Sequence, residues 1–162
     1  MRLLVLGGTA FVGSAVVSEA VRRGWSVTTL NRGRTGRPPE SVDARIGDRR
    51  EPDGLAALGD DGWDLVVDTW STGPIAVQAA ARALVDRVGR YAYVSSRSVY
   101  AAPVALGVDE SAPVVDARPD AGDGDYAEMK RGGELAVTEA FGDRSLIARA
   151  GLILGPREDV GR

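Results

Sequence analysis

The 162-residue chain contains no cysteine and no histidine, and it has a single lysine among its 20 basic residues. Without cysteine it can form neither disulfides nor thiolates. Without histidine as well, it cannot build a Cys and His metal site or a histidine-based catalytic triad, and we expect no metal site. Long apolar runs are also missing, because the N-terminal Met-Arg-Leu-Leu-Val-Leu is too short for a secretory signal and no other run approaches membrane length. These absences favour a cytoplasmic protein with no membrane partner.

An excess of charge of either sign is lacking too. The chain has 20 basic and 23 acidic residues and a formal net charge of −3. Such mild acidity gives no general electrostatic reason to bind nucleic acid, which we do not expect as a partner. Hydrophobic residues make up 44% of the chain and charged residues 27%, which is typical of a globular domain. At this length we expect one domain with a sizeable core.

Short apolar runs alternate with amphipathic stretches along the chain. The runs predict strands at residues 3–6, 25–30, 42–46, 64–68, 91–95 and 145–149. The amphipathic stretches predict helices at residues 11–23, 74–88 and 126–141, with a weak short helix at 55–58 and a long surface loop at 101–124. Strands alternating with helices at this spacing indicate βαβ units and an α/β fold with a doubly wound parallel sheet.

A glycine-rich segment, Gly-Gly-Thr-Ala-Phe-Val-Gly from Gly7 to Gly13, follows the first predicted strand and leads into the first predicted helix. Glycines at such a turn let the backbone approach a pyrophosphate, whose negative charge the helix N-terminus stabilises. The alternative is that the glycines only form a tight turn. The place of the segment in the first strand-turn-helix of an α/β pattern favours dinucleotide binding.

The second predicted strand ends in Asn31-Arg32-Gly33-Arg34, with no carboxylate at its tip to bind two ribose hydroxyls. Two nearby guanidinium groups favour NADP over NAD, since a basic side chain accommodates the 2′-phosphate. The alternative is a solvated basic loop. Asp48, after the third predicted strand, would accept a hydrogen bond from an adenine amino group, or it is an ordinary turn aspartate.

The only lysine, Lys130, follows Tyr126 by four residues in a predicted helix, so both side chains lie on one face. A nearby cation favours the phenolate, which a tyrosine needs in order to act as a general acid or base near neutral pH. Ser95 and Ser96 end the fifth predicted strand, at the edge where open parallel sheets bind ligands. Polar strand ends are common, so the serines alone decide nothing.

In this order the motifs resemble the extended short-chain dehydrogenase/reductase superfamily, and within it the NAD-dependent epimerase/dehydratase family, from Met1 to about Pro156. The resemblance rests on the glycine loop, Gly-Asp after the third strand, Ser-Ser-x-x-Val-Tyr, Tyr-x-x-x-Lys, and Arg-x-Gly-x-x-x-Gly-Pro after the sixth strand. Ala10 stands where the family usually has a glycine, and Trp70 where it usually has small residues beside the cofactor. The glycine loop is nearer to a subgroup that includes chloroplast stem-loop RNA-binding proteins and many bacterial reductases.

The resemblance implies roles for individual residues. Tyr126 would move the substrate hydroxyl proton, Lys130 would bind the nicotinamide ribose and favour the phenolate, and Ser96, with Ser95 as the fallback, would bind the reacting oxygen. The expected cofactor contacts are Gly7, Gly8, Thr9, Ala10, Phe11, Val12, Gly13, Asn31, Arg32, Arg34, Asp48, Thr69, Trp70 and Lys130.

The resemblance also implies a single three-layer Rossmann-type NAD(P)-binding domain over residues 1–156, with 157–162 beginning a separate or missing substrate region, because family members are roughly twice as long. The implied function is that of an NAD(P)-dependent oxidoreductase, epimerase or dehydratase acting on a small-molecule hydroxyl or carbonyl substrate, with nucleotide sugars among the candidates. The alternative is a non-catalytic NAD(P)-binding sensor or an RNA-binding relative. A homodimer face, or the core, would use two helix pairs: Leu84 with Val88, and Leu135 with Val137.

Overall fold

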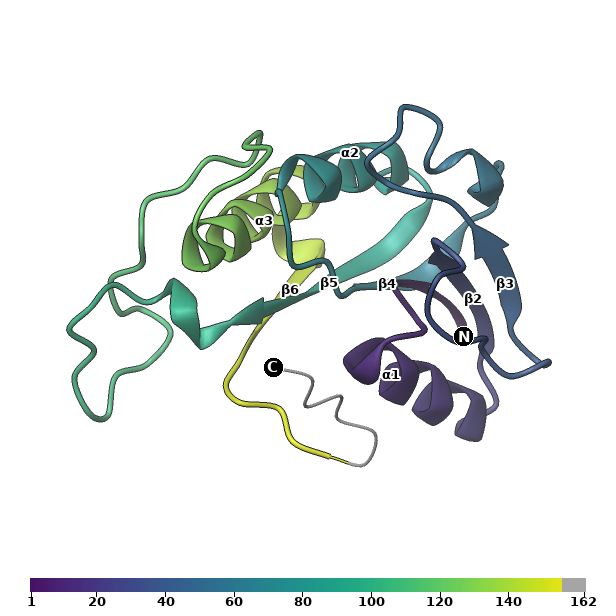
Figure 1. Ribbon diagram of the computed structural model, residues 1–162, viewed down its shortest axis with the longest axis horizontal. Coiled ribbons are helices and arrows are strands. Elements are labelled where there is room, and N and C mark those ends of the chain that lie inside the picture. Colours follow the sequence, from purple (N-terminus) through teal and green to yellow (C-terminus); the bar gives the residue numbers. More distant parts are fainter. Residues whose placement is uncertain (156–162) are drawn as a thin grey trace.

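In the computed structural model, which describes residues 1–155, six parallel strands form one sheet in the order β3-β2-β1-β4-β5-β6 (Figure 1). The strands are β1 (Arg2–Leu6), β2 (Ser26–Asn31), β3 (Asp43–Ile46), β4 (Trp63–Asp68), β5 (Val88–Ser96) and β6 (Ser145–Ala150). The α-helices are α1 (Phe11–Arg22), α2 (Ile75–Leu84) and α3 (Tyr126–Phe141), and the short 3-10 helices are η1 (Ala56–Leu58), η2 (Arg97–Val99) and η3 (Gly142–Arg144). The α/β fold with a doubly wound parallel sheet is confirmed. The expected boundary at 156/157 lies outside the described residues.

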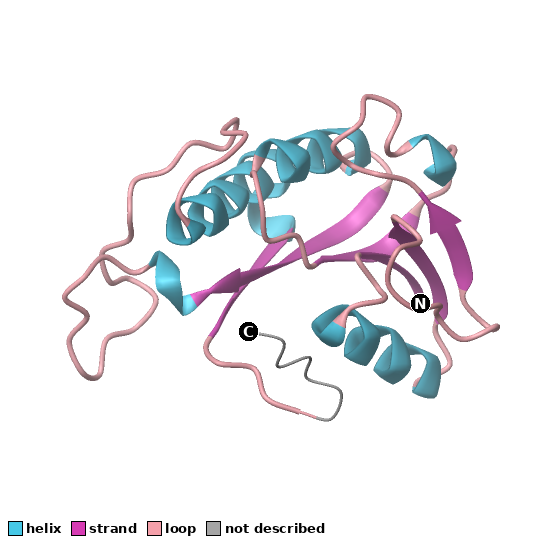
Figure 2. Cartoon of the chain, viewed as in Figure 1, coloured by secondary structure: helices cyan, strands magenta, loops and turns pink. Residues whose placement is uncertain are grey.

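Helices cover both faces of the sheet, as Figure 2 shows, with α2 and α3 on one side and α1 on the other. The core accordingly has two parts. The larger part lies under α2 and α3 and includes Leu4, Val66, Tyr91 and Phe141. The smaller part lies under α1 and includes Val17 of the helix. Both strand faces are therefore buried in the middle of the sheet, which explains why the strands read as continuous apolar runs.

The sheet reverses its order of connection at β1. The chain passes from β1 outward to β2 and β3, then returns to β4 on the other side of β1. The carboxyl ends of β1 and β4 lie side by side, with Leu6 in register with Asp68. The connections from these two ends run to opposite faces of the sheet, which leaves a crevice where open α/β sheets bind ligands.

The predicted helix at 74–88 is too long. α2 ends at Leu84, and Val88 is the first residue of β5, where it pairs with Trp63 and is 4% exposed. The apolar run continues across the boundary, so periodicity could not separate the end of the helix from the start of the strand. Val88 therefore belongs to no helix face, while Leu84 and Val137 are fully buried in the core.

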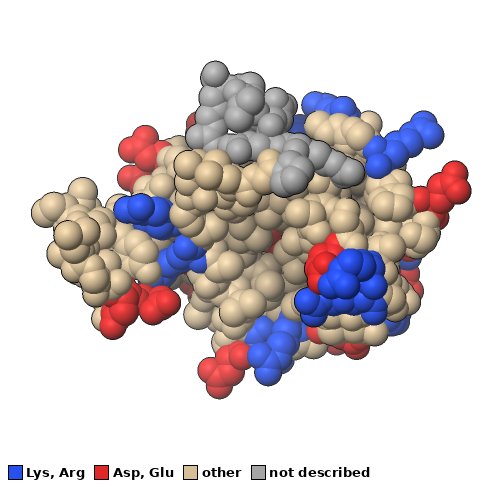
Figure 3. All heavy atoms as spheres, turned by 90° about the horizontal axis from the view of Figure 1, so that it is seen from below, with Lys and Arg blue, Asp and Glu red and all other residues tan. Residues whose placement is uncertain are grey.

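The segment between η2 and α3 contains no helix or strand in the described structure, as expected for 101–124, and one isolated bridge joins Tyr100 to Val114. Three of the contacts that hold it to the fold are hydrogen bonds: Ile75 N donates to Ala121 O, Val115 N to Val99 O, and the Arg149 side chain to Glu110 O. Seen from below, on the side of α1, charged side chains are scattered around the rim (Figure 3). Within residues 1–155, even the longest helix, the 16-residue α3, falls short of what a bilayer crossing needs.

Candidate functional site

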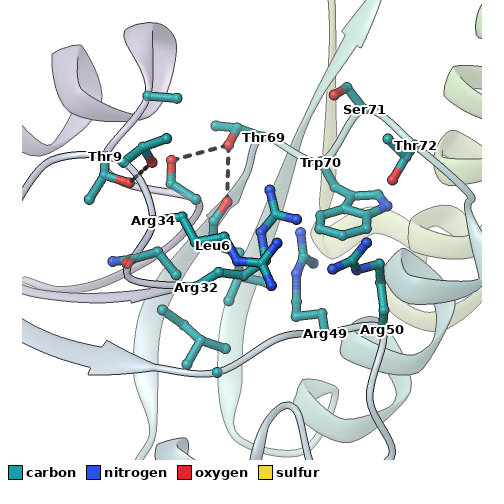
Figure 4. A pocket seen from close by; sticks show the side chains of 16 residues that line it. Leu6, Thr9, Arg32, Arg34, Arg49, Arg50, Thr69, Trp70, Ser71 and Thr72 are labelled. Carbon is teal, nitrogen blue, oxygen red and sulfur yellow. Dashed lines mark hydrogen bonds between the residues drawn. The ribbon is translucent and has the colours of Figure 1, made fainter.

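The crevice between β1 and β4 contains a cavity of about 220 Å³ (Figure 4). Its walls come from the β1–α1 loop and from the segments that follow β2, β3 and β4, as the topology requires. Of the expected cofactor contacts, this cavity brings together Gly7, Thr9, Ala10, Asn31, Arg32, Arg34, Thr69 and Trp70. Segments far apart in sequence thus meet at one edge of the sheet.

The β1–α1 loop leaves no room for side chains at its glycines. Gly7 has a φ of 101°, in the left-handed region that favours glycine, and a Cβ on Gly13 would overlap the Gly7 carbonyl oxygen. The loop is tight because α1 packs closely against β1. Ala10 is the N-cap residue of α1 and has no side-chain oxygen. The first amide groups of the helix therefore donate no hydrogen bond to an N-cap side chain. This end of α1 therefore suits an anionic ligand group.

Four arginines line the other side of this cavity: Arg32, Arg34, Arg49 and Arg50, which Figure 4 shows gathered beside the Trp70 indole. Two of them are already paired. Arg50 donates to both carboxylate oxygens of Asp48, at 3.0 and 2.5 Å, and Arg49 is bound to Asp68. Within residues 1–155, no carboxylate forms a salt bridge with Arg32 or Arg34, so their charges remain available to a ligand.

Asp48 lies near this cavity, although the cavity wall is formed by its neighbours Gly47, Arg49 and Arg50. Hydrogen bonds from Arg50 hold the pKa of the Asp48 carboxyl well below its usual value. The carboxylate is therefore ionised and occupied by Arg50. An adenine amino group that donates to Asp48, as expected from the sequence, would have to share the carboxylate with Arg50.

A second cavity, of about 280 Å³, adjoins the first and shares Ala10, Thr69 and Ser71 with it. It lies over the N-terminus of α1 and reaches the ends of β5 and β6. Of the expected site residues, it brings together Phe11, Val12, Gly13, Ser95, Ser96, Tyr126 and Lys130. The remaining expected contact, Gly8, faces the core side of its loop against Thr29 and Val17.

Tyr126 and Lys130 occupy successive turns at the start of α3 and line the same cavity, as their spacing predicts. Tyr126 is 48% exposed, whereas Lys130 is 3% exposed. The Lys130 Nζ donates to the carbonyl oxygens of Trp70, at 2.6 Å, and Val94, at 2.7 Å. Burial lowers the pKa of Lys130 to about 8. The lysine is thus a buried cation fixed by two main-chain carbonyls.

The two serines after β5 differ in their surroundings. Ser95 donates a hydrogen bond of 2.7 Å to Oε1 of Glu134, a buried residue of α3. The Ser96 hydroxyl donates a 3.1 Å hydrogen bond to the hydroxyl of Ser98 and accepts one from the Ser98 amide. In the described part of the chain the Ser96 hydroxyl has a neutral hydroxyl and an amide as its only partners, so it can exchange them for a ligand at lower energetic cost.

The sequence analysis did not predict two buried ionic groups, one at the first cavity and one beside the second. In one, Asp68 pairs with Arg49. In the other, Glu134 binds Arg131 and Arg149. Burial alone would raise the pKa of the Glu134 carboxyl, but hydrogen bonds from Arg149, Ser95 and Arg131 bring it below its usual value. The available signal was an acidic residue within each apolar pattern, one at the end of a strand and one four residues after Lys130.

Comparisons with known proteins identify the family and the fold. The model of the NAD dependent epimerase/dehydratase family matches residues 3–162. A search of curated proteins found no match. Among solved structures, a UDP-galactose 4-epimerase has a TM-score of 0.78 and 24% identity, over 99% of this chain and 59% of its own length.

Two further solved structures have the same fold. WbmG of Bordetella bronchiseptica, in complex with NAD and UDP, has a TM-score of 0.78 and 20% identity, over 99% of this chain and 56% of its own. A UDP-N-acetylglucosamine 4-epimerase from Bacillus cereus has a TM-score of 0.75 and 20% identity, over 100% of this chain and 63% of its own. The chain therefore spans between 56% and 63% of the length of these structures.

Proposed function

The chain belongs to the NAD-dependent epimerase/dehydratase family, and from this premise we propose that it binds a nicotinamide dinucleotide across the two cavities and promotes hydride transfer with a hydroxyl or carbonyl substrate. One observation carries the proposal. A cavity with a glycine loop and an uncapped helix N-terminus is joined, through Ala10, Thr69 and Ser71, to a second cavity that holds Tyr126 and Lys130. Hydride transfer from a bound dinucleotide requires an anion site for the pyrophosphate and an adjoining cavity that contains a proton-transfer group.

The residues present suit the cofactor. The crowded contact between Gly13 and Gly7 brings the backbone close to where a pyrophosphate would lie, and the amides at the start of α1 would bind it. Lys130, in the second cavity, would hold the nicotinamide ribose. The nicotinamide would supply the hydride donor or acceptor, while the chain's own residues position it and move protons.

Tyr126 would transfer the substrate hydroxyl proton in this proposal, because its partly exposed phenol lines the second cavity near the only lysine. The buried Lys130 ammonium would stabilise negative charge on the phenol oxygen as the proton leaves. Ser96 would donate or accept a hydrogen bond at the reacting oxygen. Ser95 is the weaker candidate, since its hydroxyl is engaged with Glu134.

NADP is the proposed cofactor form. Arg32 and Arg34 line the first cavity beyond the tip of β2, where the adenosine ribose would lie. Their guanidinium groups suit a 2′-phosphate, which Arg binds with paired hydrogen bonds. Asn31 offers no charge, and its side-chain oxygen accepts from the Gly33 amide at 2.8 Å. NAD itself would leave both arginines without an anionic partner.

A nucleotide sugar is the proposed substrate class. The support is that the solved structures above include epimerases of UDP-galactose and UDP-N-acetylglucosamine, and one complex with UDP. In this chain, contacts to the sugar would come from the open side of the second cavity, near Tyr126 and Ser96. Further contacts would come from outside the span that these structures share with it.

Dinucleotide or RNA binding without turnover is the second candidate, favoured by the four arginines that line the first cavity. The Tyr126→Phe variant separates the candidates. For an enzyme, turnover of a panel of UDP-sugars, followed by product formation and by absorbance of reduced nicotinamide, falls about 10²–10⁴-fold. NADPH affinity, measured by fluorescence titration, changes less than about twofold.

Tyr100→Phe is the matched control, because it removes a phenol oxygen outside both cavities. Its turnover and NADPH affinity should equal those of the parent protein. Equal turnover in Tyr126→Phe and the parent would refute the catalytic role of Tyr126. Salt-sensitive binding of a single-stranded RNA probe by Tyr126→Phe, together with no turnover by the parent, would support the second candidate.

A further inference from the structure

A buried ion pair lies between the first cavity and Lys130. The Arg49 guanidinium donates two hydrogen bonds, of 2.8 and 2.7 Å, to the Asp68 carboxylate, and the two side chains are 6% and 0% exposed. The Tyr91 hydroxyl and the Trp70 amide donate to the same carboxylate, at 2.7 and 2.9 Å. Burial alone would raise the pKa of Asp68, but Arg49 and the other donors hold it below its usual value, so the carboxylate is ionised.

Trp70 connects this pair to the lysine. On one side the Arg49 guanidinium lies 4.7 Å from the centre of the indole ring, beside which Figure 4 shows it, and the Trp70 amide is bound to Asp68. On the other side, the Trp70 carbonyl oxygen accepts from Lys130 Nζ at 2.6 Å and from the Tyr93 hydroxyl at 3.1 Å. Trp70, which the ion pair supports, is therefore one of the two residues whose carbonyl oxygens hold the ammonium.

We propose that Arg49 and Asp68 are positioning residues for Lys130, which fix the Trp70 carbonyl and set both the place and the charge of the ammonium. The proposal rests on the proposed function only for what Lys130 does once it is positioned. A purely structural role would be to fasten the loop after β3 to the end of β4. The two roles differ in what they predict for the charge on Lys130.

The charged and titratable groups around Lys130 come from four parts of the fold: Asp68 of β4, Arg49 of the loop after β3, Tyr93 of β5, and Glu134 and Tyr126 of α3. Asp68 and Glu134 favour the ammonium, whereas Arg49 and burial favour the neutral amine. Loss of the Asp68 charge should therefore lower the pKa of Lys130, and loss of the Arg49 charge should raise it. A role limited to fastening the loop predicts no such pair of opposite shifts.

The composition makes this measurable, because Lys130 is the only lysine in the chain. Protein grown with lysine labelled with ¹³C at Cε gives one side-chain signal, whose shift against pH is the titration of Lys130. In Asp68→Asn the midpoint should fall by at least about half a pH unit, and in Arg49→Met it should rise by a similar amount. The matched control is Arg22→Met, which removes an exposed guanidinium that donates two hydrogen bonds to Glu19 on α1. This variant should leave the midpoint unchanged.

Either variant of the ion pair leaves a buried charge without its partner, so Tyr91→Phe provides a second test. It keeps both charges and the ring volume and removes only the hydroxyl that donates to Asp68. Because the carboxylate loses a donor, more of its charge acts on Lys130, and the midpoint should rise by about 0.2–0.3 unit. Shifts of the same sign in Asp68→Asn and Arg49→Met, or no shift in Tyr91→Phe, overturn the proposal. The titration uses neither dinucleotide nor substrate, so its failure leaves the proposed function standing, and failure of NADPH to bind leaves this result standing.

Discussion

The hydroxyl of Ser95 lies 2.7 Å from Oε1 of Glu134, so one of the two adjacent serines after β5 is tied to the buried part of α3. The same carboxylate accepts two hydrogen bonds of 2.9 Å from Arg149 of β6. β5, β6 and α3 are thus joined at one point beside the second cavity. Within residues 1–155 the Ser96 hydroxyl, one residue further, is hydrogen-bonded to Ser98 alone, and so it is the serine hydroxyl that a ligand can recruit.

Alanine at each serine should separate these roles. Ser96→Ala should reduce turnover of the UDP-sugar panel by about 10²-fold, because the reacting oxygen loses a hydrogen bond that strengthens in the transition state, with little change in stability. Ser95→Ala should reduce the free energy of unfolding by about 1–2 kcal/mol, because Glu134 loses a donor, with a smaller effect on turnover. Turnover assays and urea unfolding of both variants measure the contrast. A larger turnover loss in Ser95→Ala would reverse the assignment.

Glu134 should contribute strongly to stability. Glu134→Gln leaves Arg149 and Arg131 near a neutral amide at a site that is 1% exposed, so we expect a loss of about 3 kcal/mol in the free energy of unfolding. The folded protein holds the Glu134 pKa below that of the unfolded chain, so this stability is present above pH 4.5 and is lost as pH falls through the lower, folded-state value. Urea unfolding at pH 7 and pH 4 tests both points.

Glu19→Gln is the matched control for that measurement. Glu19 binds Arg22 and Arg23 on the exposed surface of α1, where solvent screens the charges. Its unfolding midpoint at pH 7 should stay within experimental error of the parent protein. Equal losses in Glu19→Gln and Glu134→Gln would show that burial does not distinguish the two carboxylates.

Local patterns predicted the scaffold of the site but not its buried charges. The alternation of strands and helices, the glycine loop and the one-turn spacing of Tyr126 and Lys130 depend on residues close in sequence, and the structure has all three. Arg49 and Asp68 are 19 positions apart and meet only because the chain returns from β3, past η1, to β4 beside β1. No local sequence pattern predicts a contact between residues so far apart. Val88 was misassigned because its local pattern is ambiguous, since an apolar residue fits a helix end and a buried strand equally well.

Gly13→Ala should test the tight loop between β1 and α1. Alanine inside a helix usually stabilises it by up to about 1 kcal/mol relative to glycine. Here its Cβ would overlap the Gly7 carbonyl oxygen, which is backbone and cannot move aside, so we expect a loss of about 1–3 kcal/mol and at least about tenfold weaker NADPH binding. The control is Gly122→Ala, where a Cβ would enter open space. Unchanged stability in Gly13→Ala would contradict the close approach.

The arginines after β2 should decide the form of the cofactor. Arg32→Ala and Arg34→Ala should each weaken NADPH binding by about tenfold, because a charge-assisted hydrogen bond to the 2′-phosphate is lost, while NADH binding stays the same. Added salt should weaken NADPH binding more than NADH binding. Fluorescence titration measures each constant, with Arg82→Ala on α2 as the control, since Arg82 does not line the first cavity. A tenfold preference of the parent protein for NADH would refute the assignment.

The buried Lys130 should also give the stability of the protein an unusual pH dependence. Its folded-state pKa of about 8 lies below the ordinary value of 10.5, so between these values the unfolded chain binds more protons than the folded protein. Stability should therefore rise with pH across this window. The contribution of the lysine is up to about 1.4 kcal/mol per pH unit and about 3 kcal/mol in all.

Lys130→Met removes the titrating group and keeps an unbranched side chain at the site. The difference in unfolding free energy between the parent protein and this variant isolates the lysine, because the other titrating groups cancel. Measured by urea unfolding from pH 8 to pH 10, it should shift in favour of the parent as pH rises. The window stops at pH 10 because burial raises the pKa values of Tyr91 and Tyr93, so tyrosine ionisation in the unfolded chain lowers stability above that point. A pH-independent difference would mean that Lys130 titrates as an ordinary exposed lysine, and its two carbonyl contacts would then not describe the protein in solution.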